Sequence, residues 1–239
     1  MKKQLVIAPE QPAYLPWCGY FSRLLGADQL LLADHVQYSS QNWQNRNYVS
    51  DGRGGNTLLT IPVGRGNFRP INEVVLSNPR WQAKHWASLR MNYARAPYWS
   101  EWKDRLEEIY THPWERLVDV DEALIRLLCD AFGIDVEIVR TSTLAPQGAK
   151  SDLVVEVCRL TDARVMRIGT GTMTYLDTQK VAETGTQIEV CTYTNPPYGK
   201  PGSSAPNRSA LDLVLQEGPG ARQVLERGAR NVPLSEWRP

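Results

Sequence analysis

Short apolar runs alternate with segments of helical spacing along much of the sequence, and this alternation restricts the fold more than any other feature. Near the N-terminus, an apolar run at 4–8 and another at 29–33 flank a helix-compatible segment at 19–25. Parallel strands joined by crossover helices have this order. The sequence therefore predicts an α/β fold with a mainly parallel sheet in its N-terminal part.

We expect one domain that spans residues 1–239 and consists of three segments. Residues 1–78 form an α/β segment that includes a hairpin at 46–63, where Asp51 and the glycines after it supply the turn. Residues 79–133 are helix-rich, and residues 134–239 return to an α/β pattern.

Helices and further strands follow the hairpin. Prolines at 97 and 113 interrupt the middle segment, since proline disfavours helix in the residue before it. The helices expected around these breaks are 80–95, 98–111 and 114–132, the last closed by Gly133. The C-terminal segment is predicted to hold strands at 136–139, 164–168 and 187–191 and helices at 151–160, 174–183, 208–216 and 221–227.

Residues 195–207, NPPYGKPGSSAPN, are too rich in proline and glycine for regular structure. A loop of this length inside a compact domain is often a lid over a site, and this one would deliver Tyr198 and Lys200. A surface loop without such a role fits the composition equally well.

Composition argues against several classes of function. The 27 Lys and Arg residues against 26 Asp and Glu residues leave a net charge of +1, which predicts neither a nucleic-acid nor a membrane partner. The separated cysteines form no C-x-x-C pair, the three histidines form no local ligand set, and the common nucleotide motifs are missing. We therefore expect no metal and no cofactor. Pro9 and Pro12 cut short the N-terminal apolar run, which predicts a cytoplasmic protein.

Aromatic residues are unusual in kind: eight Trp and ten Tyr accompany only three Phe. Because Trp and Tyr carry an N–H or O–H that needs a partner, this excess favours a polar cleft or a partner surface. Tyr14 and Trp17 are stiffened by neighbouring prolines. They would either wall a sugar or acyl site or pack their loop across the end of the sheet.

Polar residues directly follow the first two predicted strands. Gln11 comes after the first strand, and Asp34, His35 and Gln37 come after the second. Ligands of parallel α/β sheets bind beyond the carboxyl ends of the strands, so these residues are candidates for a site. Since neighbouring side chains on an extended segment point oppositely, one of Asp34 and His35 would reach the ligand while the other orients it or caps a turn.

The segment NWQNRN at 42–47 is too polar for a core strand. Its amides offer donors and acceptors, and Arg46 offers a fork suited to a carboxylate, sulfate or phosphate. We expect Trp43, Asn45 and Asn47 to bind substrate beside Arg46. The alternative is that the amides serve the loop backbone and Arg46 pairs with a structural acid.

Lys84 and His85 share one stripe of the first middle helix with Trp81. If this stripe faces the cleft, Lys84 binds substrate and His85 is the general base, because an imidazole accepts a proton near neutral pH. A solvated helix face is the competing interpretation.

Several motifs resemble those of the WbqC-like protein family: QPAYLPWCGYF at 11–21, ADHVQYSSQNWQNRN at 33–47, TIPV at 60–63, WQAKH at 81–85 and YARAPY at 93–98. A weaker likeness continues to YTNPPYGKP and RSALDLVLQEGP, so that it covers most of the chain. The resemblance implies a bacterial protein of O-antigen, other surface-glycan or natural-product biosynthesis that transfers a small acyl group, such as glycine, to an amino sugar. The GTGTMTYL segment and the Pro-rich loop depart from the commoner family pattern, which leaves the substrate open.

Three functions fit these residues. The first is acyl or aminoacyl transfer to an amine, with His85 or His35 as base, Asp34 orienting it and Arg46 holding a charged or acyl group. The second is intramolecular cyclisation of an amine, in which Arg46 stabilises an anionic leaving group. The third is a non-catalytic accessory subunit that binds a partner enzyme or carrier protein. The expected partner is a small molecule, free or carrier-bound; a small partner subunit and a homodimer are both open.

Overall fold

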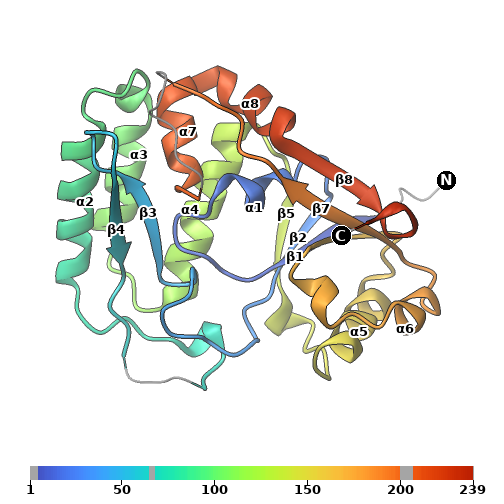
Figure 1. Cartoon of the computed structure of the whole chain (residues 1–239). Coiled ribbons are helices and arrows are strands. Elements are labelled where there is room, and N and C mark those ends of the chain that lie inside the picture. Colours follow the sequence, from blue (N-terminus) through green and yellow to red (C-terminus); the bar gives the residue numbers. More distant parts are fainter. Residues whose placement is uncertain (1–4, 65–67, 200–206, 239) are drawn as a thin grey trace.

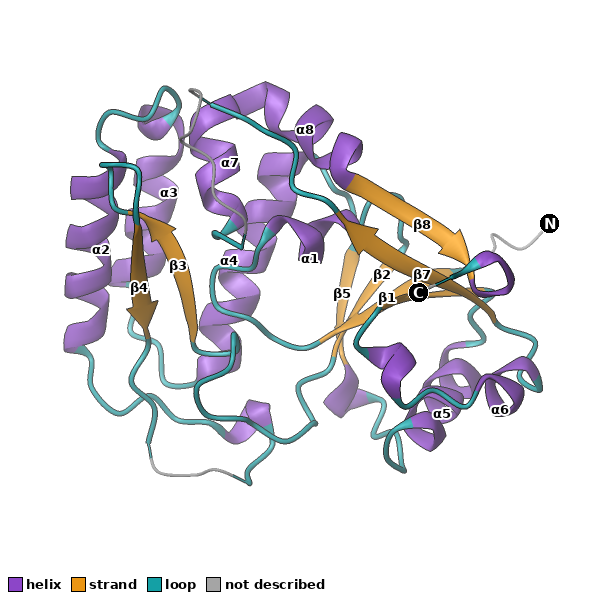
Figure 2. Cartoon of the chain, viewed as in Figure 1, coloured by secondary structure: helices purple, strands orange, loops and turns teal. Residues whose placement is uncertain are grey.

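The chain forms one mixed sheet with helices on both faces. Its structure is a computed structural model that describes residues 5–64, 68–199 and 207–238. The six-stranded sheet has the order β5-β2-β1-β6-β7-β8, and every neighbouring pair is parallel except β7 with β8 (Figures 1 and 2). Its strands are β1 (Val6–Glu10), β2 (Gln29–Leu32), β5 (Glu137–Arg140), β6 (Val165–Gly169), β7 (Gln187–Tyr193) and β8 (Ala229–Pro233). The predicted α/β class with a mainly parallel sheet is confirmed.

Alternate residues of the central strands point to opposite faces of the sheet. Ala8 and Leu30 belong to one apolar core, while Ile7 and Leu31 belong to the other. The first core lies under α1 (Cys18–Ser22), α4 (Leu117–Phe132), α7 (Ala210–Glu217) and α8 (Ala221–Gly228). The second lies under α5 (Ser151–Thr161) and α6 (Thr178–Ala182), on the opposite face (Figure 1). Parallel strands are normally covered on both faces in this way, because their crossover helices lie on the sheet.

A helical pair and a hairpin extend the first core away from the sheet (Figure 1). The antiparallel strands β3 (Arg46–Ser50) and β4 (Asn56–Thr60) pair over their full length, as the sequence predicts. The Asp51 carboxylate accepts hydrogen bonds from the Arg53 and Gly55 amides, which closes the turn. Helices α2 (Arg80–Tyr93) and α3 (Trp99–Thr111) pack together beside this hairpin. Single turns of 3₁₀ helix occur at Ile71–Glu73, Thr141–Thr143, Thr172–Thr174, Gly218–Gly220 and Leu234–Glu236.

The C-terminal segment differs from the prediction at two elements. Strand β8 is unpredicted, because its sequence, ARNVP, has a single large apolar residue, and only pairing with β7 makes it a strand. Helix α6 is shorter than the expected 174–183, since Asp177 caps it by accepting from the Gln179 and Lys180 amides. In the Pro- and Gly-rich segment, Lys200 lies outside the described residues, while Tyr198 is buried and donates to Asp212.

A buried carboxyl group on α4 leads to a first prediction. Asp121 is fully buried, and neither of its oxygens has a hydrogen-bond partner among the described residues. Burial raises the pKa of Asp121 well above its usual value, because the interior disfavours the charged carboxylate. A raised carboxyl pKa lowers stability progressively as pH rises above the unfolded pKa. We expect Asp121→Asn to raise the free energy of unfolding by about 1–3 kcal/mol at neutral pH.

Urea unfolding at about pH 4 and about pH 7 checks this expectation, because the gain should grow with pH. Asp119→Asn is the matched control on the same helix: Asp119 accepts from Arg140 Nη2 at 2.8 Å at the surface. That substitution should lower stability by up to about 1 kcal/mol. A loss of stability in Asp121→Asn at neutral pH would contradict the prediction.

Candidate functional site

A pocket lies where the direction of the chain through the sheet reverses. From β1 the chain passes outward to β2 and β5, and it then returns to the other side of β1 with β6 and β7. In open α/β sheets, the crevice beyond the carboxyl ends of two such strands is where ligands bind. Here a cavity of about 460 Å³ occupies this crevice, lined at the strand ends by Glu10, Gln11, Gly169 and Thr170. Its volume is in the range of small-molecule sites.

An ion pair stands at the carboxyl ends of β1 and β6. Glu10 ends β1, and its Oε1 pairs with Nη1 of Arg23, which follows α1. Both side chains line the pocket, and burial lowers the pKa of Arg23. A Cβ atom on Gly169 would stand only 3.3 Å from the Arg23 guanidinium, so the missing side chain leaves this guanidinium room beside β6. The two charges are thus fixed at the point where the strand order reverses.

His35 lines another part of the pocket, and its surroundings favour one of its two neutral tautomers. The Thr141 hydroxyl is placed to donate to the Leu32 carbonyl oxygen at 3.2 Å, and His35 Nδ1 contacts the same Thr141 oxygen. Leu32 O and, at 3.4 Å, Asp34 Oδ1 are both acceptors within reach of the Thr141 hydroxyl, which favours the tautomer in which Nδ1 carries the ring proton and donates. The lone pair is then on Nε2, which is buried and has no hydrogen-bond partner among the described residues. Burial lowers the pKa of His35, while Asp34 partly opposes the shift.

Asp34 fixes the turn that carries Thr141, the hydrogen-bond partner of His35. It is fully buried and accepts hydrogen bonds from the Ser142 amide at 2.8 Å and from the Ser142 hydroxyl at 2.6 Å. These bonds tie the end of β2 to the turn that carries Thr141. As the alternation along an extended segment predicts, Asp34 and His35 do not share one direction: His35 lines the pocket and Asp34 does not.

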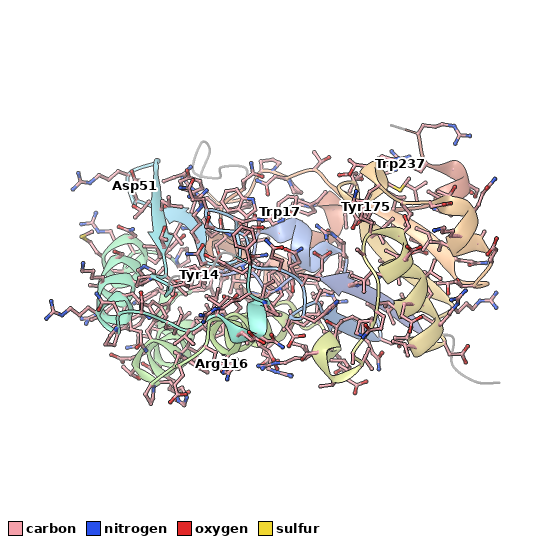
Figure 3. All side chains as sticks on the ribbon, turned by 90° about the horizontal axis from the view of Figure 1, so that it is seen from below. Tyr14, Trp17, Asp51, Arg116, Tyr175 and Trp237 are labelled. Carbon is pink, nitrogen blue, oxygen red and sulfur yellow. The ribbon has the colours of Figure 1, made fainter. Side chains whose placement is uncertain are left out.

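Amide and aromatic side chains form the remaining wall. Gln44 Nε2 donates to Gln11 Oε1 at 2.8 Å, and the Ser39 amide donates to Gln44 Oε1 at 2.8 Å. Trp17 and Trp43 also line the pocket. The Trp17 ring occupies the space beside Gly19, where any side chain would overlap it, and in Figure 3 it lies between Tyr14 and Tyr175.

Six residues that the sequence suggested for substrate binding lie outside the pocket lining: Gln37, Asn45, Arg46 and Asn47, and also Tyr14 and Lys84, which are described below. Asn45 donates to the Ile61 carbonyl and Asn47 donates to the Leu15 carbonyl, so both amides support loop backbone. Arg46 begins β3, where it is half-buried, and Gln37 is exposed beside Pro70.

His85 lies in a separate aromatic cluster in the interior. Its Nδ1 is 2.8 Å from Tyr14 Oη, which is 2.6 Å from Tyr110 Oη. Trp81 packs edge-on against the His85 ring with centroids 5.3 Å apart. Lys84 is exposed, and none of these side chains lines the pocket. The buried side of α2 therefore faces the core, and Gln11, Asp34, Arg46 and His85 do not converge on one cavity.

Comparison with known proteins places the chain in a family. The model of the WbqC-like protein family matches residues 11–224, which include every pocket residue except Pro9 and Glu10. The chain belongs to the WbqC-like protein family. It is also 26% identical over 230 residues to the uncharacterized protein Rv1507c of Mycobacterium tuberculosis, covering 94% of this chain and 98% of the relative. No solved structure matches the chain.

The comparisons do not identify a reaction, since the M. tuberculosis relative is itself uncharacterized. Within the described residues of this WbqC-like chain, no group of three or more His, Cys, Asp or Glu side chains could hold a metal ion. The described helices also include none of the length and apolar character needed to cross a bilayer.

Sequence reasoning missed the Glu10–Arg23 pair and Thr141. Glu10 is the last residue of β1, and its position at a strand end could have marked it as a candidate for ligand binding. Arg23 and Thr141 carry no local signal, because each reaches the pocket from an element that only the tertiary fold brings there. The GTGT segment at 169–172, which begins at the last residue of β6, also lines the pocket.

Proposed function

We propose that this WbqC-like protein is a small-molecule biosynthetic enzyme that transfers an acyl group to an amine, with His35 as general base. The observation that supports the proposal is the His35 side chain in the pocket, with Nδ1 held by Thr141 and the Nε2 lone pair without a partner among the described residues. A general base needs one ring nitrogen fixed by a hydrogen bond and the lone pair of the other not already taken by a donor.

The proposed step balances without a metal or a redox partner. The amine nitrogen attacks the carbonyl carbon of an activated acyl group, an ester or thioester, and forms the new C–N bond. His35 Nε2 takes the proton that the nitrogen must lose. The bond from the carbonyl carbon to the oxygen or sulfur leaving group breaks, the leaving group departs with the electron pair, and the imidazolium returns the proton to it.

Replacing His35 tests the proposal. We expect His35→Gln to lower turnover by ~10²-fold or more without unfolding the protein, as for the loss of a general base. Because burial lowers the pKa of His35, the wild-type rate should stay level through neutral pH and fall only below the ordinary histidine pKa of about 6.5. The exposed His112, which lies outside the pocket lining, provides the matched control His112→Gln.

Since the substrates are to be identified, the assay is untargeted mass spectrometry of metabolite extract from the cells that make the protein. Wild type and His112→Gln should produce the same mass changes, and His35→Gln should not. A gain equal to an acyl group identifies transfer. Loss of a small acid from a single substrate would instead identify cyclisation. Equal changes with His35→Gln would remove His35 from the mechanism.

A further inference from the structure

We infer that the pocket binds a zwitterion, with its ammonium group on Glu10 and its anionic group on Arg23. This inference deepens the proposed function, because it names the ligand class of the same pocket. It rests on the Glu10–Arg23 ion pair, both of whose side chains line the cavity.

The Glu10–Arg23 ion pair should discriminate between ligands by the charges that they carry. An ion pair with little exposure, 16% for Arg23 and 12% for Glu10, is electrically neutral as a unit. A purely anionic ligand that approaches Arg23 is repelled by Glu10, and a purely cationic ligand that approaches Glu10 is repelled by Arg23. A ligand with one charge of each sign satisfies both side chains and leaves no buried charge without a partner.

Both side chains keep hydrogen-bonding capacity for such a ligand. Only Nη1 of Arg23 contacts Glu10; within the described residues, Arg23 Nε and Nη2 donate to no acceptor. Likewise, Glu10 Oε2 accepts no hydrogen bond from the described residues. A guanidinium has five N–H donors in a fixed fork, so one bond to Glu10 leaves the fork able to bind a carboxylate or a phosphate.

The loop after β6 supplies further donors at the Arg23 end of the pair. Gly169, which adjoins the guanidinium, begins the Gly169–Thr172 segment along the pocket. No backbone hydrogen bond of the described residues uses the N–H groups of Gly171 or Thr172. Gly171 and Thr172 line the same pocket as the guanidinium, so their N–H groups favour an anionic group at the Arg23 end, and Glu10, on the β1 side, then takes the ammonium.

Matched ligands test the charge requirement on the purified chain. Dissociation constants are measured by isothermal titration calorimetry for β-alanine, phosphoethanolamine, propionate, ethanolamine and inorganic phosphate. We expect at least one of the two zwitterions to bind ~10-fold or more tightly than either molecule that carries only one of its charges. Tighter binding of β-alanine identifies a carboxylate ligand, and tighter binding of phosphoethanolamine identifies a phosphate ester. Zwitterions that bind no better than their single-charge counterparts overturn the inference.

Two variants assign the binding to the ion pair. The double variant Glu10→Gln/Arg23→Gln removes both charges and keeps the side-chain shapes, so it avoids a single buried charge; it should lose the preference for zwitterions. Gly169→Ala should weaken binding, because its Cβ would stand 3.3 Å from the guanidinium. Thermal melting shows whether each variant is folded. Unchanged preference in the folded double variant would also overturn the inference.

The inference and the proposed function can fail separately. His35→Gln should bind the zwitterion as the wild type does and lose only turnover, since His35 does not contact the ion pair in the proposed arrangement. If His35→Gln binds the zwitterion and also keeps wild-type turnover, His35 is not the base. If His35→Gln loses turnover as expected but the wild type shows no preference for zwitterions, only the inferred ligand class is wrong.

Discussion

Asp212→Ala should lower the free energy of unfolding by about 3–5 kcal/mol, the loss typical of breaking a buried charged pair. Asp212 is 1% exposed on α7. Its carboxylate accepts from Tyr93 Oη at 2.9 Å and from Tyr198 Oη at 2.8 Å, and it lies 3.5 Å from Arg208 Nη1. Truncation would leave two tyrosine hydroxyls without this acceptor and remove the buried carboxylate opposite Arg208.

The effect should extend beyond α7, since the partners of Asp212 come from several elements. Tyr93 closes α2 and its hydroxyl also accepts from the Ser50 amide on β3. Arg208 donates to Asn56 Oδ1 and to the Gly55 carbonyl on the other side of the hairpin turn. The network therefore joins the hairpin and α2 to the C-terminal helices.

Chemical denaturation of Asp212→Ala and of Asp130→Ala measures the effect against a matched pair. Asp130 also pairs with an arginine, Arg105 Nη2, at 2.7 Å, but the two side chains are 62% and 47% exposed. An exposed pair contributes only about 0–1 kcal/mol, so Asp130→Ala should change stability little. Similar losses in the two variants would show that the Asp212 network stabilises the fold no more than a surface contact does.

The elements that the sequence predicts well are those whose pattern is local. Helix α4 repeats buried residues at helical spacing and ends at Gly133, whose φ of 61° is the left-handed conformation that glycine favours. The hairpin is equally local, since Asp51 closes its own turn. Strand β8 shows the limit: residues 229–233 become a strand through their register with β7, a partner far away in the sequence.

The distinction between local patterns and long-range contacts also applies to the residues of the candidate site. Gln11 and His35 could be placed at the pocket because they directly follow strands, and the carboxyl ends of parallel strands share one edge. Composition alone could not separate Gln44, which hydrogen-bonds Gln11 in the pocket wall, from Asn45 and Asn47, which hold backbone carbonyls elsewhere. The side chains of these amides are chemically alike, and only tertiary contacts decide which of them points into the pocket.

The two histidines weighed as bases illustrate how environment decides chemistry. Both have lowered pKa values because of burial, so the shift does not distinguish them. Their partners do. His35 lines the pocket and its Nε2 has no hydrogen-bond partner in the described part of the chain, whereas His85 contacts Tyr14 inside an aromatic cluster. These partners are the reason that we propose proton transfer for His35 and a stabilising role for His85.

His85 should make the fold sensitive to acid. Burial lowers the pKa of His85 from 6.5 to about 4, with an opposing contribution from the Thr60 backbone. Between these two values the unfolded chain binds a proton that the folded chain does not, so stability is complete above about pH 6.5 and is lost as pH falls toward about 4. The shift corresponds to about 3 kcal/mol of stability lost over this range.

Comparing urea unfolding of wild type and His85→Gln between about pH 7 and about pH 4 isolates this contribution from the carboxyl groups, which titrate in both proteins. Wild type should lose about 3 kcal/mol more than the variant over the range, although the variant starts lower at neutral pH because its contact with Tyr14 is altered. His112→Gln changes the same residue type at the surface and controls for the substitution itself. Parallel pH profiles for wild type and His85→Gln would mean that the His85 imidazole is protonated within the aromatic cluster, and its assignment as a neutral packing residue would then be wrong.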